Sequence, residues 1–200
     1  YYYFRKRRSY SWIKSILNIY KSYYVFGQTI IDKIAISSGL RNKFTYHSDG
    51  VELIEKILQE KKGGVLISAH VGNFEIAEYF LNELEENVSI RVLTTDTEHS
   101  DIKDYIESVT TKSSIKFIII KDDLSHIFEI NAALARNEII CMTGDRYVNE
   151  TKSLTHTLLG KEAKFPAGPF LLGSRLKVPV IFVYVMKETS KHYHLYARTT

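Results

Sequence analysis

The sequence predicts an α/β fold with a largely parallel or mixed central sheet, flanked by helices and preceded by a helical N-terminal lead-in. Short apolar runs alternate with amphipathic stretches along most of the 200 residues, the pattern of strands and helices packed in layers. With 44% hydrophobic residues, the chain can bury one sizeable core. It contains no run of about 18 uncharged apolar residues, so no transmembrane helix is expected.

The lead-in is expected over residues 1–50, as part of the same domain as the α/β unit of residues 51–200. From Trp12 to Ala35 apolar residues recur at helical spacing, which predicts one amphipathic helix, or two with Gly27 as the break. Six of the 27 basic residues lie in residues 1–31, which contain no acidic residue. This stretch also carries 10 of the aromatic residues. All the excess positive charge of the chain therefore sits at one end.

The rest of the elements follow from periodicity and from the glycine, proline and asparagine residues between them. A helix is expected over residues 51–61, ended by Gly63 and Gly64, and Asn73 is the expected N-cap of the next helix. The expected strands are residues 65–69, 89–95, 115–120, 138–144, 156–160, 178–186 and 192–198. The expected helices are residues 74–86, 101–112, 124–137 and 165–176. The last two strands are close enough to form an antiparallel hairpin.

Two polar residues follow buried strands and are candidates for a catalytic site. His70 follows residues 65–69 and Asp145 follows residues 138–144. Ligand sites of open α/β sheets gather outside the carboxyl ends of the strands, so both side chains could face one crevice. Glu75 follows His70 by five residues, and in a first helical turn it could fold back to orient the imidazole ring. The alternative is that Glu75 is only a favourable first-turn residue and His70 a satisfied edge histidine.

Other chemistries lack their sequence motifs. GxSxG, GxxxxGK[ST] and GxGxxG are absent, which counts against a serine hydrolase, a P-loop enzyme and a dinucleotide-binding protein. No metal site is expected. His192 and His194 alternate on one expected strand and could bind a metal, with a solvated sheet edge as the other interpretation. The single cysteine, Cys141, lies in an apolar run and is expected to be a buried reduced thiol, which favours a cytosolic location.

The N-terminal stretch has two open interpretations. Basic residues interleaved with aromatics suit the headgroup layer of an anionic membrane, whereas no recognised nucleic-acid-binding module surrounds them. The alternative is a solvated basic face whose aromatic side packs on the domain. The residues assigned to membrane contact are Arg5, Lys6, Arg7, Arg8 and Trp12.

Three blocks of the sequence, in order, carry a resemblance to a known family. HVGNFE (70–75) resembles the H-x4-D/E block of the lysophospholipid acyltransferase superfamily, and its neighbours resemble the lipid A biosynthesis acyltransferase-like branch. TGDRYV (143–148) resembles the acidic block of that branch, and residues 158–185 its proline-bearing block. The basic start of the chain is similar to its helical lead-in. The C-terminal part of the family fold is expected to be missing, which suggests a piece of a longer protein.

The resemblance implies a membrane-peripheral acyltransferase at the cytoplasmic face of the bacterial inner membrane. It would move a fatty acyl group from an acyl-carrier-protein or coenzyme A thioester to a hydroxyl of a lipid or glycolipid. His70 would act as general base and Glu75 as its orienting carboxylate, with no bound cofactor and no nucleic acid partner. Two other functions remain open: a lipid hydrolase that uses the same site, and a non-catalytic lipid-binding domain.

The remaining site residues are assigned to the oxyanion, the acceptor or the shape of the site. Arg146, or backbone N–H groups near Gly72 and Asn73, would bind the oxyanion, and Asp145 would position Arg146 or bind the acceptor. The alternative for Asp145 and Arg146 is a structural ion pair. Weaker candidates are Pro166, which would rigidify a helix entrance, and Gly168, which would allow close backbone approach.

Overall fold

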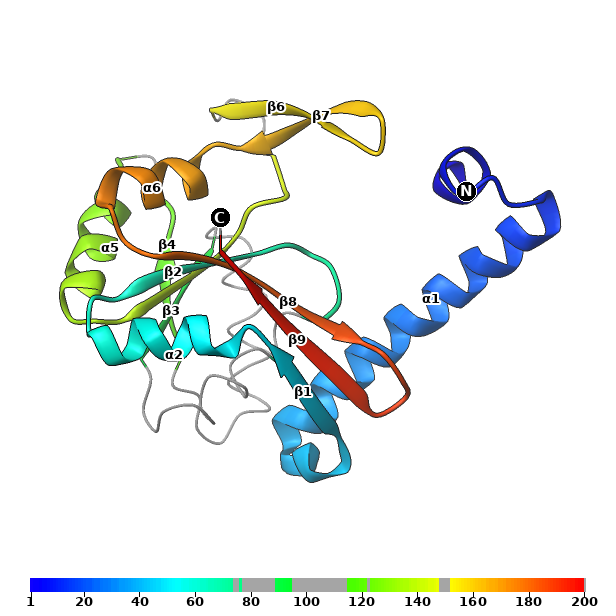
Figure 1. Cartoon of the computed structure of the whole chain (residues 1–200), viewed down its shortest axis with the longest axis horizontal. Coiled ribbons are helices and arrows are strands. Elements are labelled where there is room, and N and C mark those ends of the chain that lie inside the picture. Colours follow the sequence, from blue (N-terminus) through cyan, green and yellow to red (C-terminus); the bar gives the residue numbers. More distant parts are fainter. Residues whose placement is uncertain (74–75, 77–88, 95–114, 122, 148–151, 200) are drawn as a thin grey trace.

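Seven strands form one mixed sheet in this computed structural model, with β2 in its middle (Figure 1). The structure describes residues 1–73, 76, 89–94, 115–121, 123–147 and 152–199. The strand order is β1-β9-β8-β2-β5-β3-β4. The strands of this sheet are β1 (Thr45–Asp49), β2 (Gly64–Ser68), β3 (Ile90–Thr94), β4 (Ile115–Ile119), β5 (Ile139–Thr143), β8 (Val180–Lys187) and β9 (His192–Arg198).

The central strand β2 has the burial that its sequence predicts. Gly64 to Ile67 are all buried, and β2 pairs in parallel with β5 on one side and with β8 on the other. A parallel strand covered on both faces is expected to read as a continuous apolar run. The pairings of β1 with β9 and of β3 with β4 and β5 are also parallel, whereas β8 and β9 form an antiparallel hairpin. The predicted α/β fold and the C-terminal hairpin are confirmed.

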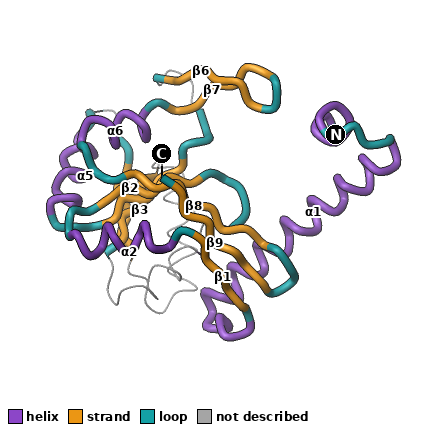
Figure 2. Tube along the Cα trace, viewed as in Figure 1, coloured by secondary structure: helices purple, strands orange, loops and turns teal. Residues whose placement is uncertain are grey.

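Helices cover both faces of this sheet (Figures 1 and 2). Ile54 and Ile57 pack in the same core cluster as Leu66, on one face of β2. Val65 and Ile67 point to the other face and join a second cluster that includes buried residues of α5. Burying each of these side chains contributes about 1.5–3 kcal/mol, so the two clusters hold the layers together. Among the described residues, the α-helices are α1 (Trp12–Ala35), α2 (Val51–Glu60), α5 (Ser125–Ala135) and α6 (Gly168–Leu176).

The N-terminal part is dominated by one long helix. Ser11 caps α1 by accepting a hydrogen bond from the Lys14 N–H at 3.3 Å. The helix runs through Gly27 without interruption, so the expected alternative of two helices broken there is wrong. Its first half extends away from the sheet (Figure 1). In the described part of the chain, no helix has both the length and the apolar character needed to span a bilayer. The short helical turns are η1 (Tyr3–Arg7), η2 (Ile36–Leu40) and η3 (Arg41–Lys43).

The lead-in is not helical throughout, contrary to expectation. Thr45–Asp49 form the edge strand β1, which pairs in parallel with β9. Its exposure alternates along the strand, and Tyr46 is its largest apolar side chain. Such a short polar edge strand has little intrinsic strand signal, so its pairing partner decides its structure. β1 therefore belongs to the same sheet as strands that come after residue 50.

A second correction concerns the segment before α6. β6 (Ser153–Leu158) and β7 (Lys161–Pro166) form a separate antiparallel hairpin, where the sequence predicted one strand over residues 156–160 and a helix from residue 165. Leu159 and Gly160 form the turn, with φ of 52° and 71°, the left-handed conformation that tight hairpin turns require. Pro166 therefore ends a strand, and α6 begins at Gly168. The helices expected over residues 74–86 and 101–112 lie outside the described residues.

Candidate active site

The carboxyl ends of two neighbouring parallel strands bring His70 and Asp145 together. Ser68 at the end of β2 is paired in register with Thr143 at the end of β5. The Gly144 N–H donates a hydrogen bond to the Ser68 carbonyl at 2.9 Å, which keeps the two chains side by side beyond the last strand residues. Both candidates lie two residues past these strand ends, and a shared location there is confirmed.

Asp145 holds His70 through two hydrogen bonds. Its Oδ1 lies 2.9 Å from His70 Nδ1, and its Oδ2 accepts from the His70 backbone N–H at 3.0 Å. The two side chains are 25% and 29% exposed, so the pair borders solvent without being fully hydrated. Partial burial alone would raise the pKa of Asp145, but the bonds from the His70 ring and backbone N–H outweigh it and hold that pKa below its usual value.

This geometry gives Asp145 the position that the sequence suggested for Glu75. A carboxylate on Nδ1 fixes the ring orientation and stabilises the imidazolium form, which is the orienting arrangement of a histidine base. Glu75 lies outside the described residues, so its expected role stays a prediction. Arg146 is exposed at the next position of the chain. The interpretation of Asp145 as a partner of His70 was not among the sequence expectations, because residues 75 positions apart give no local signal.

The loop after His70 is fixed by close contacts with β8. Gly72 has a φ of 72° and bridges to Val185; a Cβ at Gly72 would lie 2.0 Å from the Val185 carbonyl oxygen. Glycine is therefore required at this position on two grounds, backbone conformation and space. The Asn73 N–H donates to the same carbonyl at 2.8 Å, so this N–H is already bonded within the protein. That contact counts against the expected use of the Asn73 N–H in binding an oxyanion.

The side chain of Asn73 also points into the protein. Asn73 is buried, and its Nδ2 donates to the Thr29 carbonyl of α1 at 3.1 Å. Its expected capping role concerns a helix outside the described residues. Gly168 was expected to allow close backbone approach; a Cβ there would meet no protein atom within 4 Å, so no packing contact within the chain requires glycine at this position. Pro166 is the last residue of β7, opposite Ser153, and it directly precedes Ala167, the N-cap of α6.

One aromatic residue near the strand ends was missed by the sequence analysis. Phe170 of α6 lies beside Gly144, since a Cβ built there would be 3.6 Å from the Phe170 ring. Phe170 also packs against Phe182 of β8, with 6.4 Å between ring centroids. Its position in the apolar block GPFLLG was visible in the sequence, but its proximity to the residue before Asp145 depends on how α6 returns over the sheet.

The described residues outside this site show no arrangement of metal ligands. No group of three or more His, Cys, Asp or Glu side chains gathers among them. His192 and His194 each lie near Glu188, at 3.7 and 3.1 Å, and the His194 ring stacks on Tyr196. The basic residues Arg5, Lys6, Arg7 and Arg8 and the aromatic Trp12 lie at the N-terminal end of α1 and before it (Figure 1).

Comparison with known proteins identifies the family. No curated protein matched the chain. The family model for bacterial lipid A biosynthesis acyltransferase matches residues 18–199. This match covers β2 and β5, the loop that carries His70, and the hairpin β8–β9 that supports that loop. It confirms the resemblance of the three sequence blocks, and the chain belongs to the bacterial lipid A biosynthesis acyltransferase family.

Proposed function

We propose that the protein transfers a fatty acyl group from an acyl thioester to a hydroxyl of a lipid or glycolipid acceptor, with His70 as the general base. Family membership makes it an acyltransferase of the lipid A biosynthesis type. The observation that supports the mechanism is the 2.9 Å contact between His70 Nδ1 and Asp145 Oδ1. A base oriented in this way suits proton removal from an acceptor hydroxyl.

The reaction follows from this arrangement in two steps. Nε2 of His70 takes the proton of the acceptor hydroxyl as its oxygen attacks the thioester carbonyl carbon, giving a tetrahedral intermediate. That intermediate collapses by breaking the C–S bond, and the imidazolium returns the proton to the departing thiolate. The products are an acyl ester and a free thiol, without a covalent acyl-enzyme.

Charge develops at two points, and different residues stabilise each. Asp145 stabilises the imidazolium through the Nδ1 contact, which is a charge-assisted hydrogen bond in that state. The oxyanion needs a donor that is already in place. Arg146 and the backbone N–H of Gly72 are the proposed donors, while the Asn73 N–H is bonded to β8. Glu75 is proposed as a second carboxylate acting on His70, as the H-x4-E block implies.

Membrane contact through the N-terminal segment is the second part of the proposal. Trp12 is 62% exposed and Ile13 64% exposed, next to a run of four basic residues. The hairpin β6–β7 extends this surface, since Lys161 Nζ lies 4.4 Å from the centroid of the Tyr2 ring. Leu158 and Leu159 at its turn are also more than half exposed. Basic and apolar side chains together favour an anionic bilayer, and we propose that the protein acts at the cytoplasmic face of the bacterial inner membrane.

Vesicle binding tests the membrane part. Each exposed Lys or Arg near an anionic surface contributes about 1 kcal/mol. Replacing the four basic residues at positions 5–8 by glutamine should weaken co-sedimentation with phosphatidylglycerol vesicles, and high salt should mimic the change. Replacing Lys56 and Lys62, exposed basic residues on and after α2, is the matched control and should have little effect. Equal binding to neutral and anionic vesicles at every salt concentration would refute the electrostatic contribution.

Product analysis tests the catalytic part. The enzyme is incubated with radiolabelled palmitoyl-coenzyme A or palmitoyl-acyl carrier protein, together with a lipid A precursor that carries free hydroxyl groups. Acyl transfer predicts label in the lipid, with the preferred donor given by the faster of the two thioesters. Label only in free fatty acid indicates a hydrolase. Mass spectrometry of lipids from cells with and without the gene then identifies the natural acceptor as a species shifted by one acyl group.

A further inference from the structure

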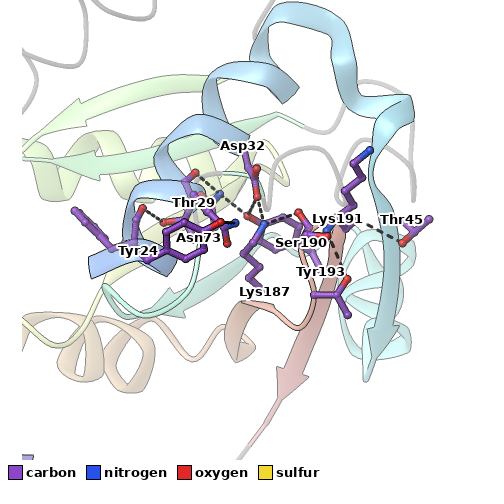
Figure 3. A network of polar contacts seen from close by, with 12 residues as sticks. Tyr24, Thr29, Asp32, Thr45, Asn73, Lys187, Ser190, Lys191 and Tyr193 are labelled. Carbon is purple, nitrogen blue, oxygen red and sulfur yellow. Dashed lines mark hydrogen bonds and ion pairs between the residues drawn. The ribbon is translucent and has the colours of Figure 1, made fainter. Parts of the chain in front are cut away.

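A buried polar network joins α1, the hairpin β8–β9 and the loop that carries His70 (Figure 3). The Asp32 carboxylate of α1 accepts hydrogen bonds from Lys187 Nζ and from the Tyr193 hydroxyl, the latter at 2.6 Å. Lys187 also donates to the Ser190 carbonyl at 2.8 Å. Asn73, three residues after His70 in the chain, has its Nδ2 3.5 Å from the Tyr193 hydroxyl.

The burial of these groups argues against a role in stability alone. The Lys187 side chain is 5% exposed and the Asp32 side chain 12%, and Tyr193 is fully buried. The free-energy cost of desolvating a Lys and an Asp offsets most of their electrostatic attraction. A buried ion pair therefore contributes little to the net stability of the fold. Its best-attested role is to specify one packing arrangement over others. Here the arrangement it specifies is the contact of α1 with the hairpin and with Asn73.

Few residues of α1 are buried, and Asp32 is one of them. Ser15 and Asp32 are the buried residues of this helix. Asp32 is also the first acidic residue of the chain, after 31 residues that include six basic ones. Burial and the bond to Asp32 raise the pKa of Tyr193, so its hydroxyl stays protonated and able to donate.

Asn73 is the point where this network meets the catalytic loop. Its backbone N–H is bonded to Val185 of β8, and its side chain reaches the Thr29 carbonyl of α1 and the Tyr193 hydroxyl. The loop is therefore held at Asn73 on one side and at His70, by Asp145, on the other. Only two residues separate these anchors, so a shift of Asn73 moves the His70 ring relative to Asp145.

We infer that Asn73, held in place by Tyr193 and the Asp32–Lys187 pair, is a positioning residue that sets the orientation of His70 for proton transfer. This inference rests on the proposed function of His70 as the base. Asn73 touches neither substrate nor the reacting atoms in this scheme; it acts through the loop. The Tyr193 hydroxyl contacts the side-chain amide of Asn73. The buried Asp32–Lys187 ion pair keeps α1 and the hairpin in the arrangement in which Asn73 reaches both Thr29 and Tyr193.

The test uses Asn73→Ala and Tyr193→Phe in the full chain. Acyl transfer from palmitoyl-coenzyme A to a lipid A precursor gives kcat and KM, and thermal unfolding gives the stability of each variant. A displacement on the order of 1 Å can cost about 10²-fold in rate, so Asn73→Ala should lower kcat by roughly 10- to 100-fold. Tyr193→Phe should lower it by about 3- to 10-fold, the effect of one hydrogen bond. The KM for the thioester should be unchanged in both.

Two matched controls remove similar hydrogen bonds elsewhere. Asn131 donates to the Ile127 carbonyl of α5 at 2.9 Å, and the Tyr196 hydroxyl lies 3.3 Å from Glu188 on the same hairpin as Tyr193. Asn131→Ala and Tyr196→Phe should leave kcat within about twofold of the wild type, because surface changes of this kind have small effects. If Asn73→Ala does not fold, Tyr193→Phe decides the question.

A second background separates positioning from general destabilisation. The His70→Ala variant lacks the imidazole ring that Asn73 would orient. Adding Asn73→Ala or Tyr193→Phe to it should therefore not lower the residual rate further. If Asn73→Ala or Tyr193→Phe lowers the rate by the same factor in both backgrounds, the change only reduces the fraction of folded protein. That result would overturn the inference. Wild-type rates in Asn73→Ala and Tyr193→Phe would also overturn it. Near-normal activity of His70→Ala itself would instead refute the proposed function.

Discussion

Asp145→Asn is the most direct test of the His70–Asp145 pair, because the two hydrogen bonds restrict how the new amide can sit. The carboxylate accepts from the His70 backbone N–H through Oδ2 and contacts Nδ1 through Oδ1. The backbone N–H can only donate, so the amide oxygen of the variant must take its place. The amide NH₂ then faces Nδ1 and donates to it, which moves the ring proton to Nε2. The nitrogen proposed as the base is thereby blocked.

The expected loss can be worked out from the charges. Opposite unit charges about 4 Å apart interact by about 4 kcal/mol at an effective dielectric constant of about 20. Both side chains are a quarter or more exposed, at 25% and 29%, so solvent screening reduces the effect to about 2 kcal/mol. That corresponds to about 30-fold in rate, and the unfavourable tautomer adds to it. We expect kcat to fall by about 10²–10³-fold, within the range of a general base.

The measurement is acyl transfer from radiolabelled palmitoyl thioesters under single-turnover conditions, which isolates the chemical step from product release. Asp145→Asn, His70→Ala and the double variant are compared with the wild type. Because both residues act through one imidazole ring, the double variant should be no slower than His70→Ala. Thermal unfolding of each variant checks that the fold is retained. The Asp123→Asn variant is the matched control. The exposed Asp123 carboxylate accepts a hydrogen bond of 2.9 Å from the Ser125 N–H and has no contact with His70 in the proposed mechanism.

Two results would refute the reasoning. A loss of less than about threefold in Asp145→Asn would mean that the carboxylate does not act on the base. Losses that multiply in the double variant would mean that His70 and Asp145 act independently.

The remaining predictions concern the loop, a second carboxylate and the stability of the sheet. Gly72→Ala should lower the acyl-transfer rate more than tenfold, because Ala at positive φ costs about 1–2 kcal/mol and the clash of its Cβ with β8 must move the loop. As a control within α1, a Cβ at Gly27 would meet no atom within 4 Å. Gly27→Ala should therefore raise the free energy of unfolding by about 0.5–1 kcal/mol in thermal unfolding. Glu75→Gln should reduce the transfer rate severely but less than His70→Ala does, and it should add nothing to the loss in that background; independent losses would exclude their coupling. Burial alone would raise the pKa of Glu138, but two arginines lower it from 4.5 to about 2. The stability from these ion pairs is therefore present above about pH 4.5 and is lost toward pH 2. Glu138→Gln should cost about 2–3 kcal/mol at pH 7, and a difference in melting temperature from the wild type that stays constant from pH 7 to pH 2 would contradict this.

The strands that are buried on both faces were predictable from the sequence. The polar edge strand β1 and the separate hairpin β6–β7 were not. Residues 64–68 and 139–143 read as apolar runs because both faces of these strands meet helices. The edge strand at residues 45–49 and the hairpin at residues 153–166 carry polar and basic side chains. The edge strand pairs with β9, far away in the chain, and the hairpin pairs only within itself, and neither carries the continuous apolar run that marks a strand buried on both faces.

The candidate site divides in the same way. Its histidine was found from its place after a buried strand and from the H-x4-E block around it. Its orienting contact with Asp145 was not found, although both residues had been selected as candidates. The choice between Glu75 and Asp145 depends on which carboxylate the fold brings to Nδ1, and a distance of 2.9 Å to Asp145 is a property of the paired strands.

The sequence by itself determined the layered α/β architecture, the family and the strand end where chemistry is expected. Those features depend on local periodicity and on short motifs, which each segment carries alone. Only the tertiary structure decided that Gly72 must be glycine, that Asp32 pairs with Lys187, and that Asn73 reaches α1. These contacts join residues that are far apart in the chain. Their energies arise from burial and from complementary donors and acceptors, and neither exists until the sheet, the long helix and the hairpin have packed together.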